Sequence, residues 1–144
     1  MIVRHPEIAP ALMAKYREGV VYGGTSAGTA IMSDPMLWAP DKQPELFTTM
    51  KGLGLLPTDI MVDQHFFARE SRLARLKASL LKHHLPYGLG VDEDGAVTVT
   101  DGRFVTVHGQ ERVMVLLNFE DSTPDKITEF ILKPGDRYEL ISRK

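Results

Sequence analysis

Cysteine is absent from the 144 residues, which excludes disulfide bonds and thiol catalysis. The chain also lacks any apolar stretch near the roughly 20 residues that a membrane span needs, and its N-terminus has no apolar signal core. No charge of one sign dominates, because 17 basic residues stand against 19 acidic ones. We therefore expect a cytoplasmic protein with neither a nucleic-acid partner nor a membrane partner.

What the chain does contain is an ordinary globular composition, with 43% hydrophobic and 25% charged residues. Its length is sufficient for one hydrophobic core, and neither an internal repeat nor a linker divides it. Residues 1–144 are therefore interpreted as a single domain.

The most informative stretch covers residues 20–31, where an apolar run meets two glycines and a serine. Gly24, Ser26 and Gly28 match the G-x-S-x-G pattern of a nucleophile elbow, in which a sharp strand-to-helix turn exposes the serine hydroxyl. We expect a strand from Val20 and a helix from Ala27, because glycine accepts the backbone angles of such a turn. The alternative is an ordinary glycine-rich turn with a capping Ser or Thr.

A serine nucleophile needs a base, and His65 follows a strand-like run, 39 residues after Ser26. The C-terminal end of such a strand is the edge at which open α/β sheets bind ligands. A histidine that merely makes a hydrogen bond or faces solvent is the alternative. A metal site built from Asp63, His65 and Asp92 is a further one, although these residues fit no compact ligand motif.

An acidic group follows another short apolar strand that begins at Gly88. A carboxylate is needed to hold the imidazole in one tautomer, and Glu93 is our choice for it. Asp92 and Asp94 fit a turn instead, because Asp favours local hydrogen bonds of that kind.

These residues form three ordered blocks that resemble the cyanophycinase family, within the peptidase E group of serine peptidases. The blocks are Gly24-Thr25-Ser26-Ala27-Gly28, Asp63-Gln64-His65-Phe66 and Gly88-Leu89-Gly90-Val91-Asp92-Glu93, and the similarity covers roughly residues 11–117. The resemblance implies a three-layer α/β/α sandwich of the class I glutamine amidotransferase type and no cofactor. It also implies a Ser26-His65-Glu93 triad, with the backbone N–H of Ala27 in the oxyanion hole.

The substrate implied by the resemblance is a cyanophycin-like polymer or another aspartyl-containing peptide, cleaved to β-aspartyl-arginine dipeptides. The residues implied to hold it are Asp63, Gln64, Arg69 and Arg72. Arginine suits a free carboxylate because its planar fork can bind both oxygens. Arg69 is the stronger arginine candidate, since a solvated helix face with ion pairs explains Arg72 and Arg75 equally well.

In the family, about half of the enzyme precedes the serine elbow and includes core strands and an oxyanion-hole loop. Here 25 residues precede Ser26, so the resemblance implies an incomplete peptidase domain with weak or no activity. We expect a homo-oligomer or a complementing chain to supply the rest. The alternatives are an inactive fragment that acts as an interaction module, and an amidotransferase or esterase on the same fold.

The remaining pattern predicts the surrounding elements. Apolar spacing predicts a helix over residues 6–18 that packs on the sheet, and a helix over residues 68–81 that buries Leu73, Leu76 and Leu80. Residues 33–49, which contain Trp38, are expected to form a long loop. Strands are predicted over residues 96–100 and 103–108 as a hairpin, over 113–117, and over 127–132 and 138–141 as a second hairpin.

Overall fold

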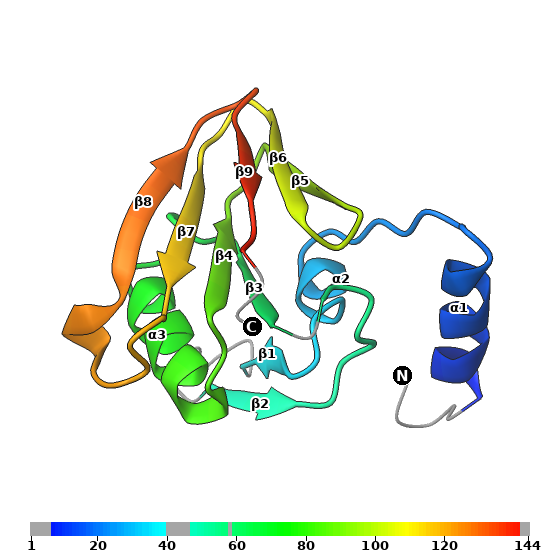
Figure 1. Ribbon diagram of the computed structural model, residues 1–144, viewed down its shortest axis with the longest axis horizontal. Coiled ribbons are helices and arrows are strands. Elements are labelled where there is room, and N and C mark those ends of the chain that lie inside the picture. Colours follow the sequence, from blue (N-terminus) through cyan, green and yellow to red (C-terminus); the bar gives the residue numbers. More distant parts are fainter. Residues whose placement is uncertain (1–6, 40–46, 58, 142–144) are drawn as a thin grey trace.

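A computed structural model of the protein describes residues 7–39, 47–57 and 59–141. Short helices and strands alternate along the chain (Figure 1). In chain order they are α1 (Ile8–Arg17), α2 (Ala27–Ala30), β1 (Met36–Trp38), β2 (Thr48–Met50), β3 (Ile60–Gln64), α3 (Ser71–His83), β4 (Tyr87–Val91), β5 (Gly95–Thr100), β6 (Phe104–Gly109), β7 (Val113–Leu117), η2 (Pro124–Lys126), β8 (Thr128–Leu132) and β9 (Arg137–Glu139).

Two sheets stack against each other to form the core. The central sheet has the strand order β3-β4-β7-β8, with β3 and β4 parallel and the other neighbours antiparallel. The outer sheet has the order β5-β6-β9 and is antiparallel throughout. Because β3 and β4 are covered on both faces, their residues form continuous apolar runs rather than an alternating pattern.

Helix α3 covers one face of the central sheet, where Leu76 and Leu80 are fully buried. It approaches β4 so closely that a Cβ on Gly88 would lie 2.9 Å from a methyl carbon of Leu80. The outer sheet covers the opposite face and buries Val105 and Val107 there. The protein is thus a mixed α/β fold. Over the described residues, strands rather than helices occupy the face where an α/β/α sandwich would have its second helical layer.

Several local predictions are confirmed. The helix predicted over residues 68–81 is α3, which begins three residues later because Arg72 N–H bonds to Arg69 O in a preceding turn. The β5–β6 hairpin forms around Asp101 and Gly102, and β7 extends the central sheet beside β4. Each of these features depends on residues close together in sequence or on a long apolar run.

The strand predicted from Val20 is wrong. Residues 19–25, here termed the elbow coil, are irregular, and the Val21 side chain is 92% exposed. A β-propensity becomes a strand only when a neighbouring strand accepts its backbone hydrogen bonds. Among the described residues, no strand pairs with this segment.

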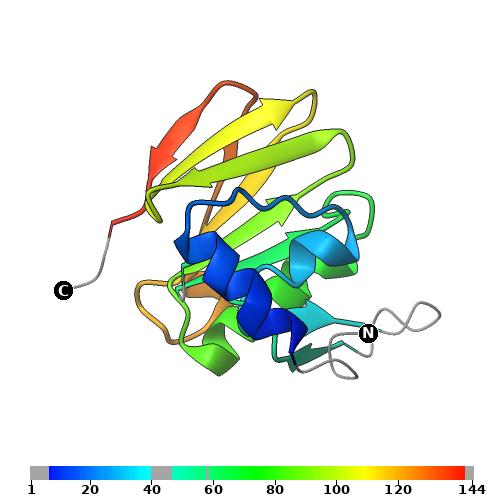
Figure 2. The same ribbon diagram turned by 90° about the vertical axis from the view of Figure 1, so that its right-hand side faces the viewer.

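The helix predicted over residues 6–18 is confirmed as α1, but its predicted packing on the sheet is wrong. No residue of α1 is buried, and Figure 2 shows the helix beside the elbow coil rather than on a sheet. Its apolar stripe instead meets the elbow coil, where the Tyr16 and Tyr22 rings lie 6.2 Å apart. The Tyr22 hydroxyl also donates to Leu12 O at 3.0 Å.

The second hairpin is also wrong, because β8 pairs with β7 and β9 pairs with β6. The turn between β8 and β9 carries the chain from one sheet to the other, and Gly135 N–H donates to Val107 O there. The long loop predicted over residues 33–49 instead contributes β1 and part of β2, which pair as a small antiparallel sheet. Residues 40–46 of that predicted loop lie outside the described residues.

Over the part of the chain that the structure describes, each helix is too short or too polar to cross a bilayer.

Candidate active site

Ser26 occupies a sharp turn between the elbow coil and α2. Its backbone has φ 53° and ψ −121°, a combination that L-residues rarely adopt. The turn is tight because a Cβ on Gly24 would lie only 2.1 Å from Gly28 O, so glycine is required at that position. Thr29 closes the turn by donating from its hydroxyl to Gly24 O at 2.8 Å.

His65 lies at the C-terminal end of β3, directly opposite this turn. Its φ of 47° is also left-handed, and the next residue, Phe66, returns to the sheet by donating from its N–H to Val91 O. His65 Nε2 lies 3.0 Å from Ser26 Oγ, so residues 39 positions apart are in hydrogen-bond contact. Both side chains therefore meet at one edge of the central sheet.

Glu93 follows β4 at the same edge, and its Oε1 lies 2.7 Å from His65 Nδ1. A carboxylate can only accept, so Nδ1 carries the proton and donates to Glu93. In a neutral imidazole, Nε2 is then the acceptor for the Ser26 hydroxyl. The His65 and Glu93 side chains are 33% and 65% exposed, which leaves the dyad open to solvent on one side.

Ala27 is the first residue of α2 and is exposed. The helical hydrogen bonds begin after it, with Gly28 N–H bonded to Thr25 O and Thr29 N–H bonded to Ser26 O. The N–H at the first position of a helix has no acceptor within the helix. This donor therefore stands next to Ser26 without a helical partner.

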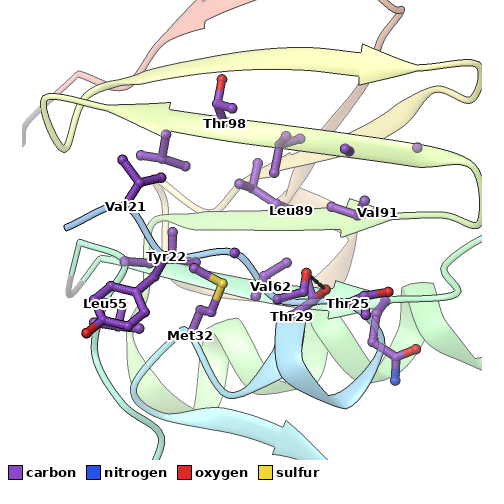
Figure 3. A pocket seen from close by; sticks show the side chains of 18 of the residues that line it. Val21, Tyr22, Thr25, Thr29, Met32, Leu55, Val62, Leu89, Val91 and Thr98 are labelled. Carbon is purple, nitrogen blue, oxygen red and sulfur yellow. Dashed lines mark hydrogen bonds between the residues drawn. The ribbon is translucent and has the colours of Figure 1, made fainter. Parts of the chain in front are cut away.

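A cavity of about 850 Å³ opens beside Ser26 and His65. Figure 3 shows Val62, Leu89 and Val91 from the central sheet on one side, Val21 and Tyr22 from the elbow coil, and Thr98 from β5. The cavity thus lies between two extended segments, the elbow coil and β5. Its apolar walls and its reach along β5 leave room for more than a single small group.

The polar lining of this cavity is acidic. It includes the carboxylates of Asp92, Glu93, Asp94 and Asp101, whereas no Lys or Arg among the described residues lines it. Two lining acceptors, Gln64 Oε1 and Asp92 Oδ1, are buried and have no hydrogen-bond donor within the described chain. Such groups are costly to leave unpaired, so they favour a ligand that brings N–H donors.

Asp63 is fully buried beneath His65 and makes no contact with the cavity. Its Oδ1 accepts from Arg72 Nη1 at 2.9 Å and from Arg75 Nη2, and its Oδ2 accepts from Arg75 Nε at 2.6 Å. Burial raises the pKa of the Asp63 carboxyl above its usual range, and the adjacent Arg75 guanidinium opposes that rise. Asp63 and Arg72, implied above as substrate contacts, are therefore inaccessible to a substrate in this structure.

Arg75 is the member of this cluster that the sequence did not reveal as a partner of Asp63. A signal for burial existed for its neighbour, because Arg72, Leu76 and Leu80 follow each other at four-residue spacing on one helix face. Arg69, the arginine favoured from the sequence, lies exposed before α3. It borders a separate cavity of about 130 Å³ together with Phe66, Phe67 and Glu70.

The metal alternative has no geometric support over residues 7–39, 47–57 and 59–141. No three His, Cys, Asp or Glu side chains there converge closely enough to hold a metal ion.

Comparison with known proteins agrees with the blocks around Ser26, His65 and Glu93. The model of Peptidase family S51 matches residues 2–107. A cyanophycinase of Synechococcus elongatus is 34% identical over an alignment of 142 positions, which covers 83% of this chain and 42% of the relative. A cyanophycinase of Geminocystis herdmanii is 36% identical over 101 positions, covering 67% of this chain and 36% of the relative.

A cyanophycinase of Trichormus variabilis is 32% identical and covers 83% of this chain and 45% of its own length. The chain therefore spans about two fifths of the length of the curated relatives that it matches. The family match nevertheless covers most of the chain, including all three blocks. On these grounds the chain belongs to peptidase family S51.

Proposed function

We propose that this chain carries the catalytic residues of a serine peptidase of the cyanophycin-degrading type, with Ser26 as nucleophile, His65 as base and Glu93 as the acid that orients His65. The observation that supports this assignment is the continuous hydrogen-bonded chain from Ser26 Oγ through His65 to Glu93, with distances of 3.0 and 2.7 Å. These distances suit proton transfer between positioned groups.

In the proposed acylation step, Ser26 Oγ attacks the carbonyl carbon of an aspartyl peptide or isopeptide bond. The Oγ–C bond forms while the hydroxyl proton passes to His65 Nε2, and Glu93 stabilises the resulting imidazolium. The Ala27 N–H donates to the oxyanion. The C–N bond then breaks, and the leaving amine takes the proton from His65.

Hydrolysis of the acyl-enzyme reverses these roles. A water molecule attacks the ester carbonyl and gives its proton to His65 Nε2, which returns it to Ser26 Oγ as the Oγ–C bond breaks. The chain offers one oxyanion donor, the Ala27 N–H. Because losing a donor typically costs about 10²–10³ in rate, we expect weak turnover by the chain as it stands.

The cavity supports a substrate that carries a guanidinium beside the scissile bond, as a β-aspartyl-arginine unit does. Gln64 Oε1 and Asp92 Oδ1 are buried acceptors in need of donors, and three further carboxylates give the cavity a negative field. We assign Gln64 to direct substrate contact. Arg69 is proposed to bind a free carboxylate of a longer substrate from outside this cavity.

The test is covalent labelling of the whole chain with a fluorophosphonate, followed by intact mass and peptide mapping. We expect one label on Ser26, none on the Ser26→Ala variant, and slower labelling of Glu93→Gln by about 10²-fold or more. Ser122→Ala, which changes an exposed serine far along the chain, should label like the parent. Labelling that survives in Ser26→Ala contradicts the proposal.

Turnover is measured separately, as the release of arginine-containing product from β-aspartyl-arginine substrates. We expect slow hydrolysis that depends on Ser26. Serine-dependent hydrolysis at ordinary enzymatic rates contradicts the expectation of a weak enzyme but not the assignment of the nucleophile.

A second candidate is an inactive module that works only in association with another polypeptide. It is favoured by the elbow coil and α1, because Val21 is almost fully exposed and α1 buries no residue. An unpaired β3 at the edge of the central sheet offers a place for an added strand. Sedimentation of the chain decides between a homo-oligomer and a monomer, and labelling of Ser26 in a monomer disfavours this candidate.

A further inference from the structure

A buried charge cluster lies directly behind His65. The Asp63 side chain is fully inaccessible, and the Arg72 and Arg75 side chains are nearly so. One carboxylate accepts from both guanidiniums and from the backbone N–H of Gln64 at 2.8 Å. The cluster therefore joins α3 to the last residues of β3.

This arrangement gives little as a purely stabilising device. Arg72 Nε and Arg75 Nη1 are buried without an acceptor among the described residues, so the cluster is not fully satisfied. Buried ion pairs often contribute no more to folding than well-packed apolar side chains of similar size. The surrounding positions, such as Met61 and Leu76, are apolar and fully buried. A role in geometry explains the charged residues better than a role in stability.

The geometry to be fixed is that of His65. It leaves β3 with a left-handed φ of 47°, a conformation that persists only where its surroundings enforce it. On its C-terminal side, Phe66 is held by its N–H bond to Val91 and by Gly90, where a Cβ would lie 2.4 Å from the Phe66 ring. On its N-terminal side, the corresponding restraint is the Asp63 carboxylate with its bond to Gln64 N–H.

We propose that Asp63, held by Arg75 and Arg72, is a positioning residue that sets the orientation of the His65 imidazole toward Ser26 and Glu93. This inference rests on the proposed function for its catalytic consequence, but not for its geometry. It assigns Asp63 and Arg72 to the support of the base rather than to contact with substrate. Substrate affinity should therefore depend little on the cluster, whereas the rate of the chemical step should depend on it strongly.

The test uses four variants of the full chain. Asp63→Asn and Arg75→Met break the cluster, and Arg75→Lys keeps the charge but loses the two-pronged bond. Lys77→Met is the matched control, because it removes another ion pair of α3, to Glu129 of β8, without touching the strand that carries His65. Each variant is first checked by near-ultraviolet circular dichroism and thermal melting.

The first readout is the pH profile of Ser26 labelling by a fluorophosphonate. We expect Asp63→Asn and Arg75→Met to lower the labelling rate at least 10-fold and to displace the pH midpoint. Arg75→Lys should recover part of the loss, and Lys77→Met should match the parent. An unchanged rate and midpoint in the two cluster-breaking variants overturns the proposal, as does an equal loss in Lys77→Met.

The second readout is the proton resonance of His65 Nδ1, assigned by its loss in His65→Gln. A strong hydrogen bond to Glu93 moves this resonance far downfield, and we expect the shift to shrink in Asp63→Asn. The measurement needs no turnover, so it tests the positioning role even where the parent chain fails to label. If Asp63→Asn does not fold, Arg75→Lys decides: a parent-like resonance and labelling profile in that variant overturn the proposal.

Discussion

At the scale of single residues, both side chains proposed to react stand on backbone that L-residues avoid. Ser26 and His65 have φ values of 53° and 47°. In each case a nearby glycine leaves the space that the conformation needs: Gly24 beneath the elbow and Gly90 beneath Phe66. The aim of the reacting atoms is therefore set by positions that carry no functional group of their own.

The two glycines of the elbow give a residue-scale prediction. Gly24→Ala places a Cβ 2.1 Å from Gly28 O and should both destabilise the protein and slow Ser26 labelling at least 10-fold, because the turn must open. Gly28→Ala meets nothing within 4 Å and should leave stability unchanged or raise it by up to about 1 kcal/mol. Urea unfolding and labelling rates measure both effects, and similar behaviour of the two variants contradicts the explanation.

The convergence of Ser26, His65 and Glu93 could be predicted from the sequence because each follows an apolar run or occupies a turn signature. Their catalytic roles stay predictions. The burial of Arg75 against Asp63 could not be predicted in the same way. A sequence shows that an arginine lies near a helix face, but it does not show which carboxylate the fold brings to that face.

At the scale of elements, local signals were reliable and choices of partner were not. Asp101 and Gly102 predict the β5–β6 hairpin because the turn itself favours antiparallel pairing. The same reasoning fails for β8 and β9, which pair with different sheets. The strand expected from Val20 fails for a related cause, since a strand needs a neighbour that this segment does not find among the described residues.

The C-terminal end of α3 gives a prediction for pH. His83 Nε2 lies 2.8 Å from Thr49 Oγ1 of β2, and burial together with the charges of Lys82 and His84 lowers the pKa of His83 below 6.5. The unfolded chain therefore binds the proton first as the pH falls. Stability from this site is complete above pH 6.5 and is lost as the pH falls below 6.5 toward the lowered folded pKa.

Urea unfolding at pH values of about 7.5 and about 5.5 measures this loss. The His83→Gln variant should lose less stability than the parent over the same interval. A parent and variant with parallel pH dependence would show that His83 does not contribute.

At the scale of the whole molecule, Tyr87 joins the two sheets. It is fully buried in β4, and its hydroxyl donates to Ile141 O and accepts from Ile141 N–H, each at 2.7 Å. Tyr87→Phe should lower the free energy of unfolding by about 1 kcal/mol, because Ile141 is exposed enough for water to replace the lost bonds.

Chemical denaturation measures this change, with an unaltered dependence on denaturant as a sign of an unaltered fold. Tyr138→Phe is the control, since the Tyr138 hydroxyl makes no hydrogen bond among the described residues and should be dispensable. Equal effects of the two substitutions would contradict the bridging role of Tyr87.

The order in which the chain visits its two sheets has a consequence for how the protein can come apart. The path runs from β3 and β4 to β5 and β6, back to β7 and β8, and finally to β9, so each sheet is assembled from separated stretches of sequence. A protease nick between β6 and β7 leaves two pieces, and neither owns a whole sheet. Such pieces would have to stay together or unravel together, which makes the two layers a single cooperative unit rather than two detachable ones.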